Sequence, residues 1–203
     1  MSALSIAEAA RRIRSGGLVA YPTETVWGLA ADAHSTAAVA KLRAWKGRDA
    51  RKPMAVLVTD YRALDVVGAE TTPLAAQLAA EFWPGPLTLI VRCAGAFAPG
   101  IASEDGAVGF RCSPHPVASA LARAAGAITA TSFNRTGEPA CATRAEAERC
   151  AGGAIALVLG EDAHAAAPSS VVDASGSAPR LLREGAISKR ALEAAVNAGG
   201  MRG

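Results

Sequence analysis

The sequence is poor in aromatic residues and in the residue types that most often bind transition metals. Phe, Trp and Tyr together make up 4% of its 203 residues, and there are only four cysteines and three histidines. No two cysteines form a C-x-x-C pair, and the histidines are not spaced to complete a zinc site with them. We therefore interpret the cysteines as reduced, small apolar side chains, expect no metal held by the protein, and expect a core of Ala, Leu and Val.

Long apolar runs and a strong net charge are also lacking. Nowhere does the chain offer the ~20 consecutive apolar residues of a membrane span, and its first residues do not resemble a signal peptide. We therefore expect a cytoplasmic protein. The formal net charge of +3 is compatible with an anionic partner but does not by itself indicate nucleic-acid binding. With 51% hydrophobic and 19% charged residues and no linker or repeat, the chain is predicted to be a single domain over 1–203.

The common catalytic motifs are missing as well. The sequence contains no G-x-S-x-G, no G-x-x-x-x-G-K-[ST], no G-x-G-x-x-G and no H-E-x-x-H. Chemistry that depends on those nucleophiles, phosphate loops or metal sites is therefore not indicated.

What is present is an alternation of amphipathic helices and short apolar strands. A capping box at Ser5 and Glu8 begins the first helix, and Thr72 with Pro73 begins another that ends at WPGP (83–86). Further helices are expected at 36–45, 115–126, 143–152 and from 188 onward; strands are expected at 18–22, 53–58, 87–91, 107–111, 127–132, 154–160 and 169–174. This pattern predicts an α/β fold with a mixed β-sheet covered on both faces.

Polar side chains gather just after these strands, where open α/β sheets bind ligands. Four stretches have this character: YPTETVWGLAADA (21–33), KGRDARKP (46–53), TSFN (131–134), and PSSVVDA (168–174) with RLLREG (180–185). Each also has an ordinary local explanation, namely helix caps, turn hydrogen bonds or a solvated charge cluster. Local pattern alone leaves both explanations open.

The KGRDARKP stretch illustrates the ambiguity. If Gly47 ends the preceding helix, Lys46 and Arg48 can converge on one anion, because side chains two residues apart face alike in extended backbone. We interpret Arg51 and Lys52 as the rim that leads into the next strand. A solvated loop would explain the same charges.

Taken together, the motifs resemble the YrdC/Sua5 family of threonylcarbamoyl-AMP synthases, over nearly the whole chain from Ala10 to about Leu192. YPTETVWGLAADA, KGR followed by KP, WPGPLTLIV, VGFRCSPHP, TSFN-x-x-G, SSVVD and LLREG occur in the family's order. The resemblance implies a twisted mixed sheet flanked by helices around a positively charged cavity. The chain ends shortly after its last helix and so resembles the family's short, single-domain form.

The resemblance also implies an activity. Family members join L-threonine, bicarbonate and ATP into threonylcarbamoyl-AMP with release of pyrophosphate, for the t6A modification of tRNA. Mg2+ is expected to arrive with ATP, and the product is expected to pass to the t6A transferase complex. Two alternatives stay open: binding of double-stranded RNA or a tRNA stem with weak or no synthase activity, and carbamoyl-adenylate chemistry as in hydrogenase maturation.

Site residues follow by matching the family's motifs one position at a time. The Lys-x-Arg and Ser-x-Asn signature falls on Lys46, Arg48, Ser132 and Asn134, which the resemblance implies are catalytic. Thr23, Arg111, Ser132 and Ser169 match the threonine site, with Arg111 the candidate for its carboxylate. The nucleotide contacts match Lys46, Arg48, Asn134 and Arg183.

Two departures from the family pattern stand out. Many members have a histidine in the strand after the Lys-x-Arg loop, where this chain has Leu57. Many also have Ser or Thr in the loop after Ser-x-Asn, where this chain reads PACAT, so phosphate contacts from Ala140 to Ala142 are not expected.

Overall fold

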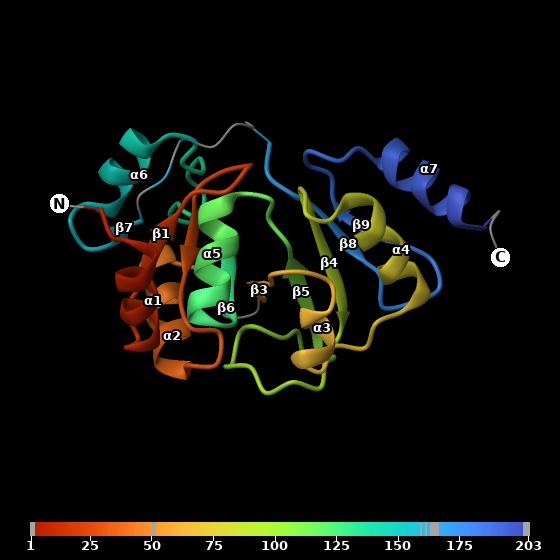
Figure 1. The fold of residues 1–203 in the computed structure, drawn as a ribbon, viewed down its shortest axis with the longest axis horizontal. Helices are drawn as coiled ribbons and strands as arrows, with labels where there is room; N and C mark the ends of the chain where they lie inside the picture. Colours follow the sequence, from red (N-terminus) through yellow and green to blue (C-terminus); the bar gives the residue numbers. More distant parts are fainter. Residues whose placement is uncertain (1–2, 50–51, 159, 161, 163–166, 201–203) are drawn as a thin grey trace.

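The computed structural model describes residues 3–49, 52–158, 160, 162 and 167–200. Its strands are β1 (Val19–Tyr21), β2 (Gly28–Ala30), β3 (Ala55–Leu57), β4 (Leu87–Arg92), β5 (Ala107–Arg111), β6 (Ile128–Ser132), β7 (Ala156–Leu157), β8 (Ser170–Asp173) and β9 (Arg180–Arg183). They form one nine-stranded sheet in the order β7-β1-β2-β6-β3-β5-β4-β8-β9 (Figure 1). The pairs β1–β7, β3–β5 and β4–β8 are parallel and the others antiparallel, which confirms the predicted mixed sheet.

Several helices begin or end at residues whose local chemistry favours it. The helices are α1 (Ile6–Arg14), α2 (Thr36–Lys46), α3 (Ala63–Val66), α4 (Pro73–Phe82), α5 (Pro116–Ala125), α6 (Arg144–Ala151) and α7 (Lys189–Gly200). The predicted capping box of Ser5 and Glu8 is present at α1, and Thr72 caps α4. Gly47 ends α2 in the left-handed conformation, with φ of 61°, which favours glycine.

Two apolar layers cover the sheet. On one face, α1 and α5 pack against each other and against β1, β2, β3 and β6, with Ile13 and Leu121 in the shared core. On the other face, α2, α3, α4 and α6 bury side chains such as Leu42 and Leu78 against a larger core. In Figure 1, α1 and α5 lie over the half of the sheet that contains β1 and β6. The face that they share is therefore only partly covered by helices.

Some elements differ from the prediction. The strand β2 was not expected, because Gly28 inside a three-residue strand is typical of a turn rather than of a strand. The expected strand at 154–160 is reduced to Ala156–Leu157 in β7. Arg51 lies outside the described residues. Among the described helices, none combines the length and apolar character that crossing a membrane requires.

Candidate active site

A cavity of about 690 Å³ lies over the part of the sheet that α1 and α5 leave open. Alternate residues of the central strands point into it, among them Ala55 on β3, Gly109 on β5 and Ala130 on β6. The intervening residues, such as Val56 and Phe110, point into the opposite core. Small side chains thus form the floor, and they leave the space that larger residues would fill.

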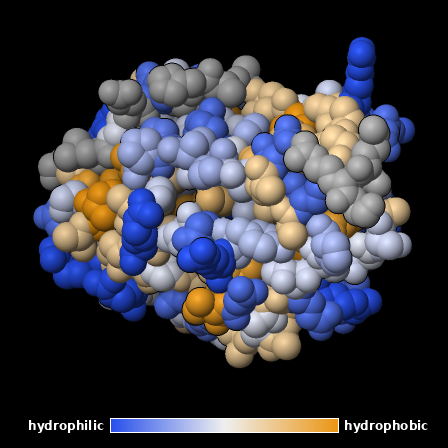
Figure 2. All heavy atoms as spheres, turned by 45° about the vertical axis from the view of Figure 1, so that its right-hand side comes forward, coloured by the Kyte–Doolittle hydropathy of each residue, from blue (hydrophilic) through white to orange (hydrophobic). Residues whose placement is uncertain are grey.

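Arginine dominates the charge of the cavity. Its described lining contains three arginines, Arg48, Arg111 and Arg183, and one acidic residue, Glu138. The pKa of Arg48 is lowered by burial and then by the charges of Arg43 and Arg183, and Arg183 also lowers the pKa of Arg111. Arg183 is therefore close enough to Arg48 and to Arg111 for the like charges to repel, which favours an anionic ligand among them. On the face of the molecule that Figure 2 shows, hydrophobic and hydrophilic residues are interspersed.

Lys46 lies behind the cavity wall. Lys46 is the last residue of α2 and is almost fully buried, with 3% of the residue exposed. The ammonium Nζ donates to the carbonyl oxygens of Ser132 (2.5 Å) and Asn134 (2.9 Å), and to Asn134 Oδ1 (3.1 Å). Burial, with the charge of Arg48, lowers its pKa to about 8. All three N–H groups thus have acceptors in the protein, and Lys46 holds the turn that carries Ser132 and Asn134.

Arg48, unlike Lys46, lines the cavity. Beyond the left-handed Gly47 its guanidinium lines the cavity and donates from Nε to Lys52 O (3.2 Å) and from Nη2 to Pro53 O (2.8 Å). The glycine therefore ends the helix as expected, yet the two cations do not meet at one point. Arg48 faces the cavity directly, whereas Lys46 acts through the turn.

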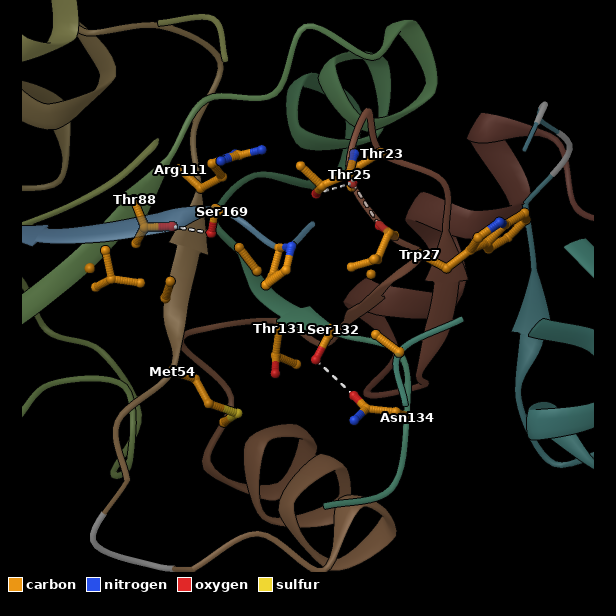
Figure 3. A pocket seen from close by; sticks show the side chains of 18 of the residues that line it. Thr23, Thr25, Trp27, Met54, Thr88, Arg111, Thr131, Ser132, Asn134 and Ser169 are labelled. Atoms are coloured by element: carbon orange, nitrogen blue, oxygen red, sulfur yellow. Dashed lines mark hydrogen bonds between the residues drawn. The ribbon is translucent and has the colours of Figure 1, made fainter. Parts of the chain in front are cut away.

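The turn after β6 presents two polar side chains to the cavity. Ser132 Oγ donates to Asn134 Oδ1 (2.7 Å), as drawn in Figure 3, and Asn134 Nδ2 donates to Glu138 O (2.7 Å). Beneath the turn, the Phe133 ring stacks on Trp45 with centroids 5.1 Å apart. Lys46 and this stack fix the turn from the core side.

Arg111 is the most unusual group of the site. It is 6% exposed, its Nη2 donates to Glu24 Oε1, and its Nη1 is buried with no hydrogen-bond partner among the described residues. The Glu24 carboxylate also accepts a hydrogen bond from Ser113 Oγ. Burial lowers the pKa of Arg111, and Glu24 opposes that shift. A buried N–H group left without an acceptor is costly, so Nη1 is ready to bind an acceptor atom of a ligand.

Hydroxyl groups surround Arg111 in the cavity. Thr23 and Thr25 lie in the β1–β2 connection with their Oγ1 atoms 3.1 Å apart, and Thr23 donates to Val26 O (2.6 Å). Across the cavity in Figure 3, Ser169 and Thr88 are joined by a 3.0 Å hydrogen bond. Arg183 holds the Ser169 carbonyl from Nε (3.1 Å) and Nη2 (2.8 Å).

The fold therefore brings most of the expected site residues to one cavity. Seven of them line it: Thr23, Arg48, Arg111, Ser132, Asn134, Ser169 and Arg183. Lys46 lies behind it, as described above. Leu57 lines the cavity beside its strand partner Arg111, so an apolar wall stands where many relatives of the resembled family have histidine. Ala140 and Ala142 also line it, with methyl groups only.

Sequence reasoning did not assign roles to Glu24, Ser113 and Thr88. Glu24 and Arg111 are 87 residues apart, so no local pattern links them. The signal that could have found them is their presence inside the quoted motifs: Glu24 in YPTET, Ser113 in VGFRCSPHP and Thr88 in WPGPLTLIV.

The described residues offer little to a resident metal ion. Among them, no group of three or more His, Cys, Asp or Glu side chains is placed to hold one. All four cysteines are free thiols. A cation that enters bound to phosphate oxygens would meet one carboxylate in the described cavity lining, that of Glu138.

Comparison with known proteins places the chain among its relatives. The family model Sua5/YciO/YrdC, described as "Telomere recombination", matches residues 11–185. The threonylcarbamoyl-AMP synthase of Bacillus subtilis is 37% identical over 94% of this chain and 56% of that protein. The threonylcarbamoyl-AMP synthase of Chromohalobacter salexigens is 37% identical over 83% of this chain and 91% of that protein.

A solved structure agrees with the sequence matches. The crystal structure of P. abyssi Sua5 complexed with L-threonine superposes with a TM-score of 0.88 at 33% identity, covering 94% of this chain and 56% of that one. The chain thus spans little more than half of the Bacillus and P. abyssi proteins, and most of the Chromohalobacter protein. On the matched family model and these identities, the chain belongs to the Sua5/YciO/YrdC family.

Proposed function

We propose that this chain is a nucleotidyltransferase that forms threonylcarbamoyl-AMP and pyrophosphate from L-threonine, bicarbonate or CO2, and ATP. The observation that carries the proposal is the cavity that Arg48, Arg111 and Arg183 line over a floor of small residues. Its volume of about 690 Å³ lies in the range of small-molecule sites. Relatives that carry the name threonylcarbamoyl-AMP synthase support it.

Threonine is assigned to the Arg111 side of the cavity. The unpartnered Nη1 of Arg111 can donate a hydrogen bond to a carboxylate oxygen of threonine. The hydroxyls of Thr23 and Ser169 line the same cavity and can hydrogen-bond to the other polar groups of the amino acid. That the P. abyssi Sua5 structure contains L-threonine supports this assignment.

ATP is assigned to the side formed by Arg48, Arg183 and the Ser132–Asn134 turn. The two guanidinium groups lie where they would balance the charge of a triphosphate, and Asn134 offers an amide next to them. Lys46 contributes by holding the turn in place.

The reaction needs alignment and charge neutralisation rather than a covalent intermediate. The threonine amine adds to CO2 and loses a proton, giving a carbamate. A carbamate oxygen then bonds to the α-phosphorus of ATP while the bond from that phosphorus to the bridging oxygen breaks, and pyrophosphate leaves. Because two anions must approach each other, arginines positioned before the reaction lower the barrier.

Mg2+ would accompany ATP and neutralise part of the phosphate charge. The described residues form no metal-binding cluster of their own, so phosphate oxygens would supply the main ligands, with Glu138 the carboxylate within the cavity. The acyl adenylate would then pass to the t6A transferase complex acting on tRNA.

The test is pyrophosphate release from ATP, with threonine and bicarbonate supplied together or singly. We expect release only when both are present. Release that ignores threonine would show the proposal to be wrong. Salt-sensitive binding of a tRNA stem that is indifferent to threonine, without such release, would favour the RNA-binding alternative instead.

A further inference from the structure

Glu24 occupies an unusual place beside the cavity. It lies in the β1–β2 connection between Thr23 and Thr25, which both line the cavity, whereas Glu24 is not among the described lining residues. Its side chain is 18% exposed and contacts the Arg111 guanidinium from the side away from Nη1. Glu24 therefore acts on Arg111 rather than on the cavity itself.

Both oxygens of the Glu24 carboxylate are occupied. Oε1 accepts from Arg111 Nη2, and Oε2 accepts from Ser113 Oγ. Ser113 is 4% exposed, and its hydroxyl oxygen in turn accepts the backbone N–H of His115 at 3.2 Å. His115 caps the first turn of α5. A continuous chain of hydrogen bonds thus runs from the start of α5 through Ser113 and Glu24 to Arg111.

This chain of hydrogen bonds fixes the orientation of Arg111, because a guanidinium group is planar. Nη1, Nη2 and Nε lie in one rigid plane, so a carboxylate that fixes Nη2 also fixes the direction in which Nη1 points. Glu24 also supplies a countercharge to Arg111, whose side chain is only 8% exposed. Without ligand, Arg111 is thus held in one orientation with a single terminal nitrogen unused.

We propose that Glu24, with Ser113 behind it, is a positioning residue that presents Arg111 Nη1 to the carboxylate of the amino-acid substrate. The inference rests on the proposed function and deepens its threonine site. Glu24 does not touch the substrate; it fixes the group that does. A misdirected Arg111 would bind the amino acid out of line with the α-phosphorus.

A competing physical effect predicts the opposite result. Glu24 and the substrate carboxylate both attract Arg111, so Glu24 could act as a competing anion whose removal strengthens threonine binding. The two effects are separated by Ser113→Ala, which keeps the Glu24 charge and removes the hydrogen bond that orients it, together with the acceptor of the His115 N–H. If Glu24 orients Arg111, both variants weaken threonine binding. If Glu24 instead competes with the substrate carboxylate, Glu24→Gln strengthens threonine binding and Ser113→Ala does not weaken it.

The experiment is steady-state pyrophosphate release by the full chain and by Glu24→Gln and Ser113→Ala, with threonine and ATP varied in turn. We expect kcat/KM for threonine to fall ~10- to 100-fold in Glu24→Gln and several-fold in Ser113→Ala, through kcat as well as KM, because small misplacements cost this much. KM for ATP should change less than about twofold. Glu148→Gln, which breaks the ion pair with Arg144 on α6, is the matched control and should leave all constants unchanged.

A second arm tests whether Glu24 acts through Arg111. In an Arg111→Met background, Glu24→Gln should cause no further loss in kcat/KM for threonine, because the oriented group is already gone. Melting temperatures of all variants report whether a loss is merely unfolding, and Ser113→Ala remains informative if Glu24→Gln is unstable.

The possible results separate the two proposals. Unchanged or improved threonine kinetics in both Glu24→Gln and Ser113→Ala overturn the positioning role and leave the proposed function intact. A rise in KM for ATP as large as the rise in KM for threonine also overturns it. Pyrophosphate release that is independent of threonine in the unaltered chain overturns the proposed function and this inference together.

Discussion

The burial of Lys46 predicts a measurable dependence of stability on pH. The residue is 3% exposed, and its ammonium donates to three oxygen acceptors. Burial and the charge of Arg48 lower the pKa of this ammonium from 10.5 to about 8. Lys46→Met removes the charge and keeps an unbranched side chain of similar length. The difference between the two proteins therefore isolates the ammonium.

The sign follows from proton binding. Between the folded and unfolded pKa values, the unfolded chain binds the Lys46 proton more tightly, so raising the pH favours the folded state. The unfavourable contribution is complete below about pH 8 and is lost as the pH passes the ordinary value of 10.5. From about pH 7.5 to about pH 9.5, this single group should add roughly 2 kcal/mol to the free energy of unfolding.

The assay is urea unfolding of the unaltered chain, Lys46→Met and Lys41→Met at both pH values. Lys41 is an exposed lysine on the same helix, so its removal should leave the pH dependence unchanged. The gain in stability on raising the pH should be about 2 kcal/mol smaller in Lys46→Met than in the unaltered chain, while other titrating groups cancel in the comparison. The same pH dependence in all three proteins would show that burial does not lower the pKa of Lys46.

Two further predictions concern the cavity itself. Arg48→Ala should lower turnover at least ~100-fold with an unchanged circular-dichroism spectrum, whereas Lys52→Ala on the exposed rim should lower it less than ~10-fold; near-normal turnover of Arg48→Ala would make Arg48 a solvated surface charge. Gly109→Leu should abolish binding of ATP and threonine in calorimetry with little loss of stability. A Cβ on Gly109 would lie 3.3 Å from Thr88 Cγ2, 3.4 Å from Ala55 Cβ and 3.6 Å from Ile90 Cγ1, and the rest of the side chain would enter the cavity that Gly109 lines. Wild-type binding by this variant would show that the cavity is not the ligand site.

Helix ends were predictable from the sequence because they depend on neighbours in the chain. Ser5 with Glu8, Thr72 with Pro73, and Gly47 each act within one turn of the helix that they cap. The short strand β2 was not predictable in the same way. Its three residues become a strand because β1 and β6 pair with them on either side, and that pairing is set by distant parts of the chain.

The sequence predicted which residues belong to the site better than it predicted how those residues are arranged. Motif matching named seven residues that line the cavity, yet it gave Lys46 and Arg48 the same role. Which cation faces the cavity depends on the Ser132–Asn134 turn packing over the end of α2, at a separation of 86 residues or more. The pairing of Glu24 with Arg111 has the same origin. Neither contact leaves a local pattern in the sequence.

In the proposed reaction, one cavity joins three substrates into a single adenylate. The most direct measurement supplies 13C-labelled bicarbonate with threonine and ATP and analyses the nucleotide product by mass spectrometry. We expect one adenylate that contains AMP, the labelled carbon and threonine, formed in equal amount with pyrophosphate. An adenylate that contains the labelled carbon but no threonine, or pyrophosphate released without a labelled adenylate, would contradict it.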